Sequence, residues 1–257
     1  MQVSELKGRA VKDLVLEEGA LAHLFEKHGI DYCIHGEESL ESACSRKGLA
    51  IEEVVHEMER AREARPYSFL HSDLWDEEFL IEYIVENHHR YVKATLPVIL
   101  TQLGTLVQQS GEQHSSLKLV LLLFQRAARE IEQHMRKEEM ILFPYIKSLA
   151  SAAEFGRRRP MAPFVTIDGP LVSMQDEHLE IEQALAKIRA LLSDYHAPSD
   201  ATLLHRTFIS AMQAFTKDMH QHIHLENNLL FPRARVLEAL FDVRTGQLRA
   251  GESLQES

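Results

Sequence analysis

Apolar residues recur at intervals of three and four positions along most of the chain beyond residue 75, which is the spacing of one face of an α-helix. Between Ile81 and Leu103 they fall at 81, 85, 92, 96, 99 and 103. The same pattern predicts amphipathic helices over four stretches, at roughly 76–108, 116–150, 170–195 and 199–238. The chain has only 11 glycines and 8 prolines, and strand-like alternation is rare, so we expect an all-α fold.

Fairly short connections join these stretches, which favours an up-down-up-down four-helix bundle. They fall at Ser110-Gly111, at 154–170 and at 196–199, where Ser199 is a natural cap for the last helix. The residues before the bundle read as short helices separated by glycines. We therefore predict a small helical N-terminal domain at 1–62, a linker at 63–75, the bundle at 76–240 and a polar tail at 241–257.

One segment of the bundle sequence occurs twice. His134 is followed four residues later by Glu138, His222 is followed four residues later by Glu226, and each pair continues into Leu-Phe-Pro at the same offset. Residues four apart share a helical face, so each copy directs an imidazole and a carboxylate the same way. Two such pairs facing each other would supply nitrogen and bridging oxygen ligands for two transition-metal ions.

The other two predicted helices also carry histidine on the buried stripe. These are His178 in the third helix and either His88 or His89 in the first, because the stripe passes equally well through both. A lone histidine or a lone His-x3-Glu is more often structural. Here every helix contributes a histidine, and two of the helices add a glutamate. No lysine or arginine falls on the stripes to neutralise the buried charge. The combination favours a metal site.

The donor types indicate which ions would fit. Imidazole and carboxylate without thiolate suit iron or manganese better than structural zinc. Two nitrogens and two shared carboxylates per ion, with an oxo or hydroxo bridge, leave positions open to dioxygen, peroxide or nitric oxide, so we expect two non-haem iron ions. His114, His220 and His224 are weaker candidates, since His114 is 20 residues from His134 and the others point off the face of His222.

Composition narrows the function classes. The formal net charge is -11, and no basic cluster appears beyond Arg157-Arg158-Arg159 in a predicted loop, so nucleic-acid binding is not expected. No apolar run is long enough to span a membrane, and the N-terminus lacks the apolar core of a signal peptide. Two cysteines give no disulfide framework, so we expect a reducing, cytoplasmic location.

The paired histidine and glutamate motifs resemble the hemerythrin-like domain of the repair-of-iron-centres (RIC) di-iron proteins. Gly169-Pro-Leu-Val-Ser-Met-Gln-Asp-Glu-His178 is similar to that family's third-helix motif, and His89, eight residues before Pro97, matches its first-helix histidine. Asp31-Tyr-Cys-Ile-His-Gly36 resembles its Asp-Tyr-Cys-Cys-Gly-Gly box, with Ile34 in place of the second cysteine. The resemblance covers roughly residues 10–235 and implies six metal ligands: His89, His134, Glu138, His178, His222 and Glu226.

The resemblance also implies a function. Such proteins restore iron–sulfur clusters damaged under oxidative or nitrosative stress, by iron donation, by nitric oxide reduction or by both, so iron–sulfur client proteins are the expected partners of a monomer or homodimer. Cys33 is either a small buried residue or a redox thiol facing the metals. An alternative function is a hemerythrin-like module that binds or senses dioxygen or nitric oxide.

Overall fold

The structure is a computed structural model that describes residues 3–64 and 74–252. Apart from an isolated bridge between Ala10 and Ser39, regular structure in these ranges is helical, which confirms the all-α prediction. The chain divides into two compact units, Met1–Asp76 with Met219–Leu229 and Glu77–Asp218 with Leu230–Ser257. The predicted linker at 63–75 falls largely outside the described residues.

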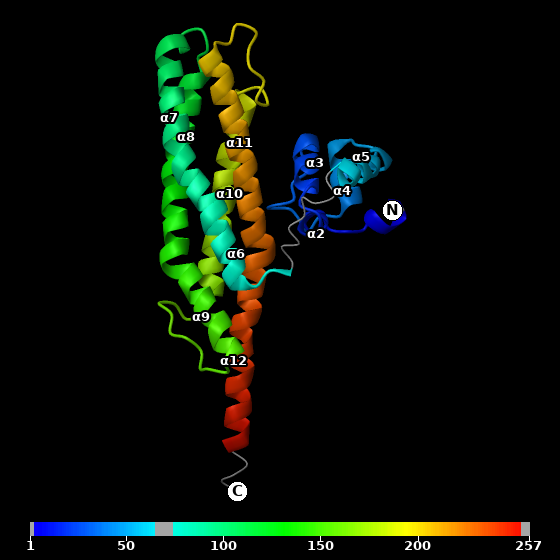
Figure 1. The fold of residues 1–257 in the computed structure, drawn as a ribbon, viewed down its shortest axis with the longest axis vertical. Coiled ribbons are helices and arrows are strands. Elements are labelled where there is room, and N and C mark those ends of the chain that lie inside the picture. Colours follow the sequence, from blue (N-terminus) through cyan, green and yellow to red (C-terminus); the bar gives the residue numbers. More distant parts are fainter. Residues whose placement is uncertain (1–2, 65–73, 253–257) are drawn as a thin grey trace. The chain divides into compact units, whose positions relative to one another are not determined.

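The N-terminal part of the first unit consists of helices, two of which end at a glycine with a left-handed backbone (Figure 1, blue). Gly29 and Gly48, at φ 64° and 66°, follow the third and fourth helices and cap them. Leu21, Phe25 and Leu40 are fully buried among these helices. The helices are α1 (Val3–Leu6), α2 (Val11–Glu17), α3 (Leu21–His28), α4 (Leu40–Lys47) and α5 (Ile51–Ala64).

A tight turn between α3 and α4 holds the Asp-Tyr-Cys box. The Asp31 carboxylate accepts hydrogen bonds from the backbone N–H groups of Cys33 at 2.9 Å and Ile34 at 3.0 Å. Burial alone would raise the pKa of Asp31, but the hydrogen bonds from His35 and these amides lower it. A Cβ atom at Gly36 would lie 2.6 Å from the Tyr32 carbonyl oxygen, so the turn requires glycine there.

The second unit and the Met219–Leu229 segment of the first supply the bundle, and each of the four predicted helices is present (Figure 1). Each forms one rod. The first, second and fourth rods change from α-helix to π-helix and back, and the third is a plain α-helix. The rods are α6–η2–α7 (Glu77–Tyr83, Ile84–His89, Arg90–Ser110), α8–η3–α9 (Ser116–Lys137, Glu138–Leu142, Phe143–Glu154), α10 (Asp168–Leu191) and α11–η4–α12 (Leu203–Leu225, Glu226–Leu230, Phe231–Glu252).

The apolar stripes read from the sequence form the core of the bundle. Phe124 of α8 and Phe215 of α11 meet edge to face at 5.6 Å, and Ile99 and Leu185 are fully buried. Burying one such side chain stabilises the fold by about 1.5–3 kcal/mol, so these stripes account for the association of the helices. No helix among the described residues is long and apolar enough to cross a membrane.

Three expectations about helix ends are wrong. The last helix begins at Leu203, not Ser199, because the Thr202 hydroxyl accepts the His205 N–H at 3.2 Å and provides the cap. The third ends at Leu191, since residues 193–195 adopt positive φ of 50°, 54° and 62°. Helix α12 continues to Glu252 through the predicted tail, whose arginine, leucine, glutamine and alanine residues favour helix.

A buried carboxylate fixes the loop between α9 and α10. Glu238 of α12 is 6% exposed and accepts hydrogen bonds from the Tyr145 hydroxyl at 2.8 Å and from the Arg159 guanidinium at 2.6 Å. Its second oxygen accepts the backbone N–H of Ile167 at 2.9 Å, immediately before α10 begins. Glu238 thus joins α9, the loop and the start of α10 to α12.

A buried histidine at the start of α11 makes metal-free stability sensitive to acid. His205 is 4% exposed, and burial, reinforced by neighbouring His114 and opposed by Asp200, lowers its pKa. Because the folded pKa lies below the unfolded value near 6.5, the unfolded chain protonates first as pH falls, and stability declines. We expect His205→Gln to lose less unfolding free energy than wild type between pH 7 and pH 5 in urea titrations of metal-free protein. His56→Gln, at an exposed position, should show the wild-type decline.

Candidate metal centre

Three of the predicted ligands lie in the π-helical turns. His89 is the last residue of η2, Glu138 the first of η3 and Glu226 the first of η4. A π turn inserts a residue into an α-helix and is common at functional sites because it changes the direction of nearby side chains. The helix interruptions therefore coincide with the residues that carry the candidate chemistry.

Glu138 and three histidines converge inside the bundle. Their side chains, on η3, η2, α8 and α10, are fully buried. The two Glu138 oxygens lie 3.5 Å from His89 Nε2 and 3.2 Å from His134 Nε2. His134 Nε2 also lies 2.9 Å from His178 Nε2. Five ring or carboxyl donor atoms from three rods therefore face one small volume.

The second copy of the motif has the same internal geometry. His222 Nε2 lies 2.9 Å from Glu226 Oε1, one helical turn further along, and both side chains are fully buried. In both copies, therefore, the imidazole and the carboxylate four residues later point the same way, as their spacing predicts.

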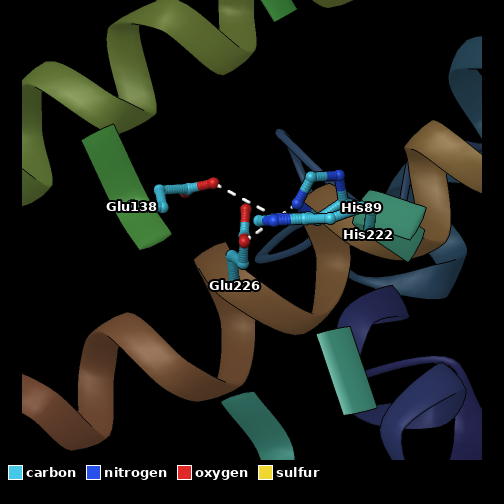
Figure 2. A group of neighbouring side chains, drawn as sticks. All are labelled: His89, Glu138, His222 and Glu226. Carbon is cyan, nitrogen blue, oxygen red and sulfur yellow. Dashed lines mark hydrogen bonds and ion pairs between the residues drawn. The ribbon is translucent and has the colours of Figure 1, made fainter. Parts of the chain in front are cut away.

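These six side chains form two overlapping groups that could each hold a metal ion. One contains His89 and His222, the other His134 and His178, and Glu138 and Glu226 belong to both. In each group the four donor atoms lie within 4.8 Å of one another; Figure 2 shows the first group. Neither Glu138 oxygen accepts a hydrogen bond from a described residue. A carboxylate buried this way requires cations, so the residues fit a pair of metal ions.

Two further carboxylates, absent from the predicted site, bind the outer nitrogens of two of these histidines. Glu139 Oε1 lies 2.8 Å from His89 Nδ1, and Glu177 Oε2 lies 3.0 Å from His134 Nδ1. Each carboxylate also accepts a hydrogen bond from a lysine, Lys93 and Lys137 respectively, at 2.6 Å. Carboxylates in this position orient metal-binding histidines and make them better donors.

Both outer carboxylates are held in the ionised form. A hydrogen bond from His134 is the main cause that lowers the pKa of Glu177 to about 2; burial opposes it and Lys137 reinforces it. For Glu139 burial is the largest influence and would raise the pKa, but hydrogen bonds from Lys93 and His89 outweigh it and lower the pKa. Each histidine therefore faces a negative charge on its outer side.

The repeated Leu-Phe-Pro sequence has a structural role beside two of the histidines. The Phe143 ring stacks on His89, with centroids 5.7 Å apart, and the Phe231 ring stacks on His178 at 5.9 Å. Each phenylalanine covers one face of an imidazole and restricts its rotation. The repetition of Leu-Phe-Pro in the sequence indicates that its phenylalanines have a shared role. It does not show which histidines they cover, because those histidines lie on other helices.

The remaining histidines within residues 3–64 and 74–252 belong to neither group. His88 Nδ1 lies 3.0 Å from Asp218, so the structure turns His88 away and brings His89 to the acidic cluster. His114 lies 3.4 Å from Asp200, and His220 lies 3.8 Å from Glu26. His224 is fully enclosed, and burial lowers its pKa to about 4.

Cys33 lies beside the helix that carries the second motif, within the first unit. Its thiol donates to the His220 carbonyl oxygen at 2.9 Å and is 4% exposed. Asn228 donates to the carbonyl oxygens of Tyr32 and Cys33, both at 3.1 Å. The thiol therefore faces the partial negative charge of a carbonyl oxygen.

Comparisons with known proteins match both parts of the chain. A family model described as the hemerythrin HHE cation binding domain matches residues 80–234, and a model described as a domain of unknown function (DUF542) matches residues 7–62. A protein of Yersinia pseudotuberculosis serotype IB and one of Yersinia pestis, both named iron-sulfur cluster repair protein YtfE, are each 29% identical to this chain over 215 residues. Each alignment covers 82% of this chain and 89% of the relative. The resemblance read from the motifs is thereby confirmed.

Proposed function

Because this chain belongs to the hemerythrin HHE cation-binding family, we propose that it holds two non-haem iron ions and repairs damaged iron–sulfur clusters. The observation that carries the proposal is the pair of overlapping groups in which two buried glutamates are shared by two pairs of histidines. The names of the relatives support repair as the role of that centre.

Each residue has a defined part in this proposal. Glu138 and Glu226 would be shared by the two ions, His89 and His222 would hold one of them, and His134 and His178 would hold the other. When bound, a pair of irons supplies redox chemistry toward small diatomic molecules and a store of metal for a damaged cluster. The surrounding apolar side chains, including Phe143 and Phe231, keep bulk water from the ligands.

We further propose that repair proceeds by donation of iron, by reduction of nitric oxide, or by both, in a reducing cytoplasm. The partners would be iron–sulfur proteins and an electron donor. Cys33 remains a candidate redox thiol, and the observation that supports it is its position against His220, two residues before His222.

Metal analysis of anaerobically purified protein, with Mössbauer spectroscopy after iron reconstitution, tests the proposed centre. We expect about two irons per chain with antiferromagnetic coupling. One zinc per chain, or no bound metal after reconstitution, would refute a di-iron centre.

Repair is tested with a [4Fe–4S] dehydratase inactivated by a nitric oxide donor. We expect the iron-loaded protein to restore activity and the Glu138→Gln variant to fail. Loading with ⁵⁷Fe follows iron into the client, and nitrous oxide in the headspace reports nitric oxide reduction. Recovery that is equally fast with the variant would contradict a role for the bound iron.

A further inference from the structure

One imidazole of the proposed centre lies between two carboxylates that are adjacent in sequence. His89 Nε2 lies 3.5 Å from Glu138 Oε2, and His89 Nδ1 lies 2.8 Å from Glu139 Oε1. Glu138 and Glu139 are the first residues of the π-helical segment η3. Consecutive residues there reach opposite nitrogens of a single ring on a neighbouring helix.

Glu139 is itself fixed from the solvent side. Lys93, one turn beyond His89 on α7, donates to both Glu139 oxygens, at 2.6 Å and 2.8 Å. The Lys93 side chain is 52% exposed, the Glu139 side chain 27% and the His89 ring 0%. The three groups therefore form a chain of charge-assisted contacts from the surface to the proposed ligand.

We propose that Glu139 is a positioning residue for the metal centre: it places the proton of His89 on Nδ1 and leaves Nε2 free to bind the ion. This inference rests on the proposed function, because it takes His89 as a metal ligand. A neutral imidazole carries one N–H, and a carboxylate 2.8 Å from Nδ1 selects the form with the hydrogen there. Its negative charge also makes Nε2 a stronger donor.

The other half of the centre shows the same arrangement, built from different helices. His134 Nδ1 lies 3.0 Å from Glu177 of α10, and Lys137 donates to Glu177 at 2.6 Å. His89 and His134 belong to different metal groups, so each proposed ion has one histidine supported by a carboxylate and a lysine. The recurrence indicates that Lys93 and Glu139 serve the metal site and are not an incidental surface pair.

The test compares Glu139→Ala and Glu139→Gln with Glu132→Ala, which removes an exposed carboxylate from the same rod. Each protein is reconstituted anaerobically with iron. The iron dissociation constant is measured by competition with a ferrous chelator, and the midpoint potential by redox titration. Circular dichroism checks that each variant is folded.

Glu139→Ala should weaken iron binding by about 10–100-fold, since it leaves His89 Nδ1 without its acceptor. The glutamine amide oxygen can still accept from Nδ1, so Glu139→Gln should bind iron within about threefold of wild type. Both variants should shift the midpoint potential upward, because loss of negative charge disfavours the ferric state, and a purely structural role would leave the potential unchanged. If Glu139→Ala folds poorly, the potential of Glu139→Gln decides the outcome.

Equal affinity and potential in Glu139→Ala and Glu132→Ala, with two irons in wild type, would overturn this inference and leave the proposed function standing. A wild-type protein that binds no iron would overturn the proposed function, and the positioning role with it.

Discussion

Replacing Glu138 with glutamine is expected to remove both irons, whereas replacing His178 with alanine should act mainly on one. Glu138 belongs to both metal groups and His178 to one. Glutamine has nearly the same shape but no charge, so Glu226 would be the one shared counter-charge left to the two ions. We expect the apparent affinity for both ions to fall at least about 100-fold, which corresponds to roughly 3 kcal/mol. Iron per chain and the Mössbauer spectrum measure the effect.

The same substitution should have the opposite effect on the metal-free fold. Glu138 is fully buried, and its oxygens accept no hydrogen bond from the described residues. Removing a buried charge of this kind is often neutral or stabilising. Metal-free Glu138→Gln should therefore be at least as stable in urea as metal-free wild type. Iron at a thousandfold the wild-type dissociation constant should add about 4 kcal/mol to wild type and at most about 1.4 kcal/mol to the variant.

Glu132→Gln, on the exposed face of the same rod, is the matched control and should match wild type both with and without iron. Two coupled irons in Glu138→Gln would show that this carboxylate does not bridge. A large loss of metal-free stability in the variant would show that Glu138 has a structural role instead.

Glu238→Ala is expected to lower the free energy of unfolding by about 3 kcal/mol, the second large effect. The substitution leaves the Ile167 N–H and the Tyr145 hydroxyl without the Glu238 acceptor and removes the carboxylate that pairs with Arg159. A loss of that size in a chain of this length lowers the melting temperature by roughly 6–12 °C. Differential scanning calorimetry of the metal-free protein measures it.

Two variants accompany this experiment. Tyr145→Phe removes one hydrogen bond to Glu238 and should cost about 1 kcal/mol. Glu154→Ala, an exposed position at the end of α9, should change stability by less than about 0.5 kcal/mol. If Glu238→Ala had the same melting temperature as Glu154→Ala, the loop between α9 and α10 would be held by other contacts.

The rods of the bundle and five of the six converging side chains could be predicted because both depend on local spacing. Apolar residues three and four apart define a helical face, and His134 with Glu138 repeats that spacing in polar residues. The choice between His88 and His89 could not be made from spacing, since neighbouring residues share a stripe equally well. The contact of His88 with Asp218, far away in sequence, separates them in the structure.

Contacts between helices account for what the sequence did not reveal. Glu139 follows a predicted ligand, but its approach to His89 depends on the π turn and on the packing of two rods. Glu177 precedes His178 in the sequence, yet it contacts His134 on another helix. The start of α11 also differs from the prediction, because the helix is capped by one hydrogen bond from the His205 backbone N–H to the Thr202 hydroxyl.

The π turns at η2, η3 and η4 have a consequence for the helical phase of the chain. A π turn holds one residue more than an α turn, so the extra residue shifts the positions at which buried side chains recur while the buried face itself continues along the rod. Leu142, Ile146 and Leu149 accordingly remain buried at the end of η3 and beyond it. Deleting one residue from η3 would restore a continuous α-helix and leave the core face of α9 toward the bundle. Such a deletion is therefore expected to disturb the metal centre more than the packing of the far half of the rod.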